Sequence, residues 1–180
     1  MSKRCALSVL SNQEIRQLIN TIPPLLSDFL DLESQVQPNG FDTTLHSIAK
    51  FDSFGTLGET NNERVLPNAE EVPFGDDGFV HLVPGCYLVR LNETVTLPNS
   101  IMALARPRSS LLRSGVSIHN AVWDAGYSGQ SQALMVVYNQ YGFKLSKNSR
   151  ILQLVFMKLA DPTSTPYGGK YQGESSNSNR

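Results

Sequence analysis

The second half of the chain is a succession of short apolar segments separated by turn residues. Pro84-Gly85, Pro98-Asn99 and the polar stretch 139–148 stand between these segments. Short apolar segments at this spacing are typical of antiparallel strands. We therefore predict a mainly β domain, a sandwich or distorted barrel with little helix. The expected strands are residues 79–83, 86–90, 95–97, 101–105, 132–139 and 151–159, and 79–83 should pair with 86–90 across the Pro84-Gly85 turn.

The N-terminal region predicts one short helix. Ser11 and Glu14 have the spacing of a capping box, in which the serine caps the helix and the glutamate bonds back to it. The helix should end near Asn20, because Pro23-Pro24 cannot continue it. Residues 25–33 are compatible with a second short helix or with a loop.

Two further segments precede the apolar strands. Residues 36–42 contain Pro38 and Asn39-Gly40, which predict a turn leading into a strand at 41–45. Asp42 lies near the start of that strand and is expected to be buried. Residues 52–78 are polar and predict loops around a short strand near 64–66.

Length and composition exclude several classes of protein. The 180 residues suit one domain, which we assign to residues 1–161, followed by a Gly/Ser/Asn-rich tail at 162–180 that alone would be disordered. A net charge of -1 argues against nucleic-acid binding. The apolar runs fall short of the roughly 20 residues of a membrane span. Cys5 and Cys86 lack a zinc-binding pattern and are expected to be free thiols. We expect a cytoplasmic protein.

A group of arginines and serines follows the strand at 101–105. Guanidinium groups donate forked, charge-assisted hydrogen bonds to phosphate oxygens, so this group suits the recognition of a polyphosphate. If Ser109 begins a helical turn, its backbone N–H groups add to an anion site. The alternative is a solvated basic turn. The group consists of Arg106, Arg108, Ser109, Ser110 and Arg113.

Asp124 is the single carboxylate between Thr94 and Ala160. It is followed by Ala125-Gly126-Tyr127-Ser128-Gly129, whose glycines allow a ligand to approach the backbone closely. If the chain carries out acid–base chemistry, Asp124 is the first candidate. The alternative is an Asx-turn at a hairpin, the usual role of an aspartate before glycine.

Other polar residues are less informative. Gln153 lies inside the apolar strand at 151–159 and needs a backbone or ligand partner, because an unpaired buried amide costs about 1–3 kcal/mol. His46, His81 and His119 are scattered and are expected to be structural. Asn120 is adjacent to His119 within the candidate site.

These motifs, in this order, resemble the trimeric dUTP pyrophosphatase (dUTPase) and dCTP deaminase superfamily, in its archaeal deaminase-like form. The resemblance implies a jelly-roll-like, distorted β-barrel and a homotrimer with active sites between subunits. It also implies that the tail at 162–180 is a flexible lid over the site. The motifs that carry the resemblance are residues 37–42, 107–111, 124–129, 150–154 and 169–173.

The resemblance implies a role for each matching residue. Asp124 would activate the water that attacks the α-phosphorus of dUTP, with Ser109 near the scissile bridge. Tyr127 would pack on the deoxyribose. Mg²⁺ would be held mainly by the triphosphate, and Asp42 would have an indirect or structural role. The remaining substrate-binding residues would be Arg108, Ser110, Arg113, Asn120, Gln153, Lys170 and Tyr171.

Two other functions stay open at this point. The dCTP deaminases of the superfamily use a glutamate on the strand after residues 124–129, and Val136 stands at that position. Since no acid occurs between Ala125 and Ala160, dUTP diphosphatase activity is favoured over dCTP deamination or a bifunctional enzyme. A non-catalytic nucleotide-binding protein is the third reading. It is motivated by Glu174, which stands where the deaminase tail has a phosphate-binding glutamine, although Arg180 could compensate for its charge.

Overall fold

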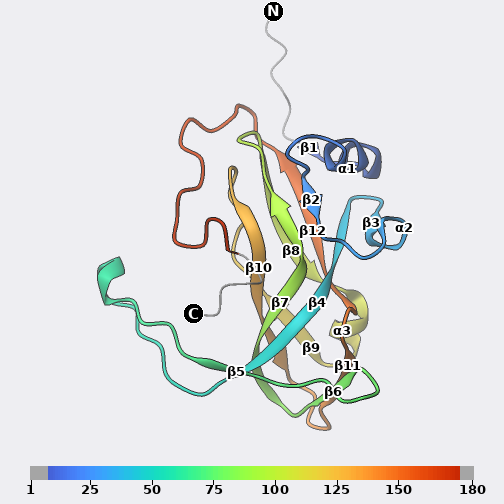
Figure 1. The fold of residues 1–180 in the computed structure, drawn as a ribbon, viewed down its shortest axis with the longest axis vertical. Coiled ribbons are helices and arrows are strands. Elements are labelled where there is room, and N and C mark those ends of the chain that lie inside the picture. The colour runs from blue at the N-terminus through green and yellow to red at the C-terminus, as the bar shows by residue number, and fades with distance from the viewer. Residues whose placement is uncertain (1–7, 175–180) are drawn as a thin grey trace, which may run out of the picture.

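The computed structural model describes residues 8–174 and consists mainly of antiparallel strands (Figure 1). The helical elements are α1 (Asn12–Ile19), α2 (Leu32–Gln35), the 3-10 turn η1 (Asn61–Glu63) and α3 (Ser109–Arg113). The strands of the first half are β1 (Ser8–Val9), β2 (Leu26–Ser27), β3 (Val36–Gln37), β4 (Gly40–Phe51), β5 (Ala69–Glu71) and β6 (Phe79–Leu82). Those of the second half are β7 (Gly85–Thr96), β8 (Ile101–Pro107), β9 (Val116–His119), β10 (Ser128–Val137), β11 (Phe143–Ser146) and β12 (Arg150–Lys158).

Ten of the strands in the described residues form one strongly curled sheet, whose main order is β1-β12-β4-β7-β10-β9. The strand β8 pairs with β12, and β4 joins β12 along its first half and β7 along its second half. Because the sheet curls, one of its faces encloses the core, which contains Phe41, Leu45, Val89, Met135, Ile151 and Phe156. The predicted jelly-roll-like, mainly β fold is confirmed.

The N-terminal helix is also confirmed. The Ser11 side chain accepts from the backbone N–H of Glu14, and the Glu14 carboxylate accepts from the backbone N–H of Ser11 at 2.9 Å. Ile15 and Ile19 face the core, and Asn20 caps the C-terminal end. Residues 25–33 form neither of the two expected structures in full, because β2 and the start of α2 share them.

Three strand predictions are wrong in detail. Residues 79–83 do not pair with 86–90, since β6 pairs with β11 in a separate two-stranded sheet. Residues 139–148, predicted to be a turn, therefore contain the strand β11. The short strand of the polar region is β5 at 69–71 rather than 64–66, where Val65 makes an isolated bridge to Thr56. In each case a distant partner, which local patterns do not show, decides the pairing.

Two irregular segments leave the body of the sheet. Residues 52–68, the arm, connect β4 to β5 and project from the body in Figure 1, with Phe54 and Leu57 84% and 80% exposed. Residues 161–174, the strap, run back beside β10 after β12 ends. The rest of the predicted tail, including Arg180, lies outside the described residues. The flexibility and lid role predicted for 162–180 stay predictions. None of the helices in residues 8–174 has the length and apolar character needed to cross a membrane.

Candidate active site

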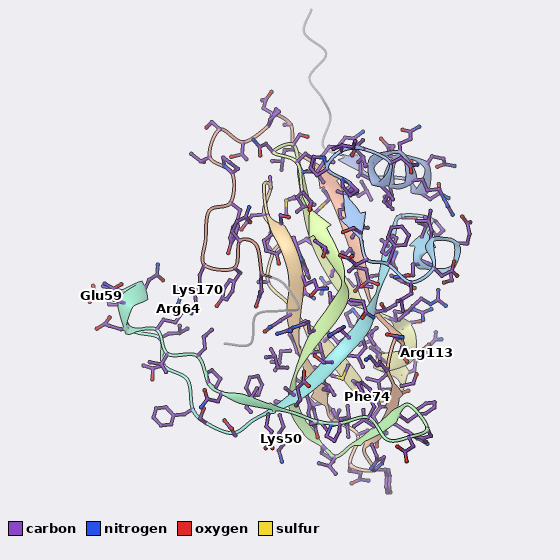
Figure 2. All side chains as sticks on the ribbon, in the orientation of Figure 1. Lys50, Glu59, Arg64, Phe74, Arg113 and Lys170 are labelled. Carbon is purple, nitrogen blue, oxygen red and sulfur yellow. The ribbon has the colours of Figure 1, made fainter. Side chains whose placement is uncertain are left out.

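The predicted site residues form two separate groups in the chain. The first, which we call the arginine cluster, lies around the meeting of β4, β8 and β12. The second lines a cleft between β7, β10 and the strap. Figure 2 shows Arg113 of the first group and Lys170 of the second on opposite sides of the molecule. The arginine cluster consists of Asp42, Arg106, Arg108, Ser109, Ser110, Arg113, Arg150 and Gln153.

Asp42 is the centre of the arginine cluster. It is 2% exposed, as predicted, and its Oδ2 lies 3.1 Å from Nε of Arg108 and 3.5 Å from Nη1 of Arg150. Burial raises the pKa of Asp42, while the two guanidinium groups lower it. Because Asp42 contacts Nε of Arg108, the terminal nitrogens of that guanidinium are available to other acceptors. Arg150 also donates to the backbone oxygen of Ser34.

A buried polar network holds the strand that carries Asp42. Nε2 of Gln35 donates to the backbone oxygen of Asp42 at 2.9 Å and to Oε1 of Glu93 at 2.6 Å. Glu93 is fully buried and also accepts from the backbone N–H and Oγ1 of Thr44. Burial raises the pKa of Glu93, and these hydrogen bonds act in the opposite direction. Such a satisfied network fixes the local backbone. Sequence patterns gave no signal for it.

The helix α3 presents the serines of the cluster. Ser109 does begin a helical turn, with Arg108 at the N-cap position. Leu111 anchors this turn in the core, which leaves Ser109, Ser110 and Arg113 exposed. Gln153 lies opposite Asp42 on one side of β12 and opposite Arg106 on the other. The register of the sheet therefore gathers residues from three motifs that are far apart in sequence.

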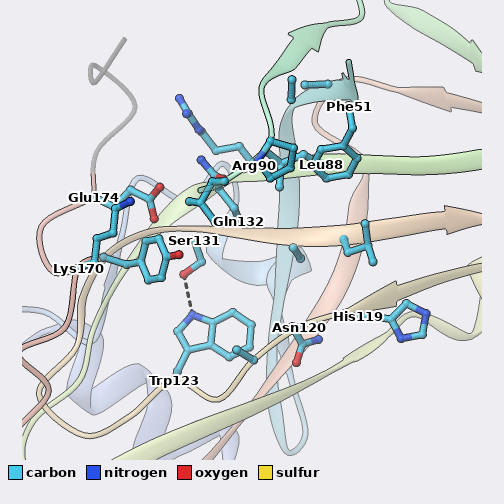
Figure 3. Close-up of a pocket in the computed structure, with 18 of the residues that line it drawn as sticks. Phe51, Leu88, Arg90, His119, Asn120, Trp123, Ser131, Gln132, Lys170 and Glu174 are labelled. Carbon is cyan, nitrogen blue, oxygen red and sulfur yellow. Dashed lines mark hydrogen bonds between the residues drawn. The ribbon is translucent and has the colours of Figure 1, made fainter. Parts of the chain in front are cut away.

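The cleft has a volume of about 1290 Å³, and Asp124 is among its lining residues. Figure 3 shows part of this lining, including Arg90, Trp123 and Lys170. Of the predicted residues, it is lined by Asn120, Asp124, Tyr127, Lys170 and Tyr171. The described lining contains no member of the arginine cluster. A single chain thus presents the candidate base and the candidate phosphate-binding arginines at different places.

Asp124 lies at an exposed turn that is closed by the backbone. The N–H of Tyr127 donates to the backbone oxygen of Asp124 at 3.1 Å, and Trp123 pairs with Ala103 of β8 on the preceding side. Within residues 8–174 the Asp124 carboxylate has no hydrogen-bond partner. The Asx-turn reading, which requires a bond from this side chain to the backbone, therefore does not describe the structure. The carboxylate is available to a ligand or to water.

Tyr127 is held firmly beside Asp124. Its ring packs edge to face against Tyr167 of the strap, with 5.6 Å between the ring centres. Its hydroxyl lies 3.3 Å from Oγ of Ser131, which accepts from Nε1 of Trp123 at 2.6 Å. Burial raises the pKa of Tyr127. The ring is 8% exposed, so a small part of it is open to the cleft.

The strap supplies charged residues to the same cleft. Figure 3 shows Lys170 and Glu174 at one end, near Arg90 and Gln132, with Asn120 and His119 farther along. Burial raises the pKa of Glu174, and the positive charge of Arg90 lowers it. Among residues 8–174, no three His, Cys, Asp or Glu side chains converge in a way that could hold a metal ion.

Several cleft residues were not predicted. Arg64 comes from the arm, Glu71 from β5, and Arg90 from β7. Each lies in a segment remote in sequence from Asp124, so a search of the motif neighbourhood could not find it. Glu71 and Glu174 weaken the sequence argument against dCTP deamination, which rests on the absence of acidic residues between Ala125 and Ala160. These two carboxylates reach the cleft from other segments of the chain.

Comparison with known proteins identifies the family. A family model described as dCTP deaminase-like matches residues 9–159. The probable deoxyuridine 5'-triphosphate nucleotidohydrolase of Methanosarcina mazei is 46% identical over 171 residues, which cover 95% of this chain and 100% of that protein. The protein of the same name from Archaeoglobus fulgidus is 51% identical over 168 residues, 93% of this chain and 98% of that one.

A solved structure agrees with this result. The 2'-deoxycytidine 5'-triphosphate deaminase of Agrobacterium tumefaciens matches with a TM-score of 0.66 and 27% identity. The match covers 85% of this chain and 48% of that chain, so the present chain spans about half of its length. The chain belongs to the dCTP deaminase-like family, and the predicted resemblance is confirmed. It is an enzyme of the hydrolase type, as its nucleotidohydrolase relatives indicate.

Proposed function

We propose that this enzyme hydrolyses dUTP to dUMP and pyrophosphate. The observation that carries the proposal is the Asp124 carboxylate, exposed at the cleft and without a partner in residues 8–174. A carboxylate in this setting can accept a proton from water as the water attacks. The new bond forms between the water oxygen and the α-phosphorus. The bridging bond to the β-phosphate breaks, and pyrophosphate leaves.

The arginine cluster suits the charged end of the substrate. Arg108 offers its terminal nitrogens because Asp42 occupies Nε, and Ser109, Ser110 and Arg113 are exposed beside it. In phosphoryl transfer, catalysis comes mostly from positioning and from stabilisation of the phosphate charge. Gln153 stands in the same group, opposite Asp42 and Arg106 in the sheet.

A second copy of the chain would complete the site. Since the arginine cluster and the cleft lie apart in one protomer, the substrate can contact both only between protomers. This is the arrangement expected for a homotrimer with sites at its interfaces. Asn120, Tyr127, Lys170 and Tyr171 would then receive the nucleoside from the cleft side, while the partner presents Arg108 and its serines.

The groups available at the cleft suit an Mg²⁺ ion that is held mainly by the triphosphate of the substrate. In nucleotide sites Mg²⁺ is usually bound by substrate phosphates, water and one or two carboxylates, and Asp124 is a free carboxylate at the cleft. Asp42 is engaged by two arginines, which favours the structural role over the indirect one. When bound, the ion would neutralise charge on the phosphates. A cytoplasmic location remains part of the proposal.

One pair of assays tests the proposal. The protein is incubated with Mg²⁺ and either dUTP or dCTP, and pyrophosphate and ammonia are measured in parallel. We expect pyrophosphate from dUTP, and a loss of about 100-fold or more in Asp124→Asn, because general bases contribute roughly 10² to 10⁴ in rate. Retained turnover in a folded Asp124→Asn protein would reject the assignment. Nucleotide binding by the wild type without turnover would favour a purely binding function.

A second candidate function is dCTP deamination. Two glutamates, Glu71 and Glu174, line the cleft although the residue at the deaminase position is Val136. A carboxylate with a raised pKa can transfer protons near neutral pH, and burial raises the pKa of Glu174. Release of ammonia from dCTP that disappears in Glu174→Gln or Glu71→Gln would establish this activity, alone or together with hydrolysis.

A further inference from the structure

The strap is tied to the Asp124 turn by a series of backbone hydrogen bonds. The N–H of Tyr167 donates to the oxygen of Ala125 at 2.9 Å. The N–H of Gly173 donates to the oxygen of Ser128 at 2.8 Å, and the N–H of Gln130 donates to the oxygen of Glu174 at 2.7 Å. The strap therefore follows the turn from its start to the beginning of β10, and both segments belong to the same protomer.

Gln172 adds a two-point contact within this series. Its Oε1 accepts from the backbone N–H of Ser128 at 3.0 Å, and its Nε2 donates to the backbone oxygen of Gly126 at 3.0 Å. A side-chain amide carries an acceptor and a donor side by side, so it can bind an N–H and a C=O together. Two such bonds fix the position and the rotation of the strap relative to the turn.

The glycines of the turn leave space for the strap. Gly126 has a φ of +88°, and a Cβ placed on it would lie 2.5 Å from Cβ of Pro166. A Cβ on Gly129 would lie 2.9 Å from the backbone oxygen of Glu174. These distances are too short for a side chain. In this structure the two glycines are therefore required by the packing of the strap on the turn.

The hydrogen bonds of Gln172 affect residues of both segments that they join, the turn and the strap. Tyr127 lies between its two bonded residues, Gly126 and Ser128. Lys170 precedes Gln172 by two residues and Glu174 follows it by two, and both line the cleft. We propose that Gln172 is a positioning residue, which fastens the strap to the turn and so sets Tyr127, Lys170 and Glu174 around the cleft of their own protomer.

The first test uses the free protein and does not depend on catalysis. In Gln172→Met both bonds are lost, while Gln172→Glu keeps an acceptor for Ser128 but loses the donor to Gly126. Amide hydrogen exchange at Ser128 should quicken about 3- to 10-fold in Gln172→Met and less in Gln172→Glu, since exposed hydrogen bonds contribute modestly. Gln13→Met, an exposed change on α1, should leave Ser128 unchanged. Unchanged exchange in Gln172→Met would overturn the proposal.

The second test, on nucleotide, rests on the proposed function. KM for dUTP should rise several-fold in Gln172→Met with kcat little changed, because Gln172 acts on binding groups and not on the attacking water. Combined with Lys170→Ala, the change should add less than its full single effect, since part of the effect of Gln172 is exerted through the Lys170 ammonium. Additive effects, or an unchanged KM beside faster exchange, would refute the positioning role. If the wild type does not turn over dUTP, the exchange result still tests the contact.

Discussion

The arginine cluster and the cleft are built in different ways. The arginine cluster is centred on a buried carboxylate, Asp42, whose strand is held by the buried network of Gln35 and Glu93. One side of the cleft is formed by the exposed Asp124 turn and the strap, which are joined largely through backbone bonds. Charged groups therefore have fixed positions in the first region, whereas in the second their positions depend on how one loop lies against another.

The largest effect on stability should come from the buried carboxylate. Asp42→Ala removes the acceptor of Arg108 and Arg150, whose side chains are each 33% exposed. We expect the free energy of unfolding in urea to fall by about 2–3 kcal/mol, somewhat less than for a fully buried pair. The control is Asp77→Ala, which breaks the exposed pair with Lys144 and should lower the free energy of unfolding far less. Equal losses of unfolding free energy in the two variants would show that the ion pairs of Asp42 stabilise the fold no more than a surface ion pair does.

A smaller and local effect is expected at the turn. Gly126→Ala would place a Cβ against Pro166 at a positive φ, so the strap must move. We expect a loss of about 1–2 kcal/mol in unfolding free energy and faster proteolysis within residues 161–174. Gly78→Ala is the matched control, because Gly78 has a φ of +74° with open space around it. If both variants behave alike, backbone strain explains the effect and contact with the strap does not.

The smallest effect concerns the charge of the cleft. Burial raises the pKa of Glu174, so this carboxyl stays neutral to a higher pH than an ordinary glutamate. As the pH rises through that raised pKa, the carboxylate becomes negative and repels phosphate. KM for dUTP should therefore increase about 2- to 4-fold in the wild type, and Glu174→Gln should remove this dependence. Glu70→Gln, an exposed change on β5, should preserve it. Identical pH profiles in all three proteins would contradict a role for Glu174.

The sequence was sufficient to predict most of the arginine cluster and the turn but not how they assemble. The burial of Asp42 and a turn at Asp124 follow from local patterns, and the helical turn at Ser109 is one of the possibilities that these patterns allow. The network of Gln35 and Glu93 does not, because its members are 58 residues apart and meet through the sheet. The docking of the strap also escaped prediction. Its bonds run mostly from backbone to backbone, with two more from one glutamine, and backbone groups have no signature in composition.

The proposed division of the site between the protomers of a homotrimer is most directly tested by complementation. Arg108→Ala and Asp124→Asn each remove one half of the proposed site, and each homotrimer should be nearly inactive on dUTP. Co-refolded mixtures should regain roughly a quarter of the wild-type rate, because random assembly pairs an intact cleft with an intact arginine cluster in about that share of interfaces. A mixture of Lys170→Ala and Asp124→Asn should be no more active than Lys170→Ala alone, since both residues belong to one cleft and no cleft in the mixture carries both. If the first mixture stays inactive although mixed trimers form, the two halves do not act together across protomers.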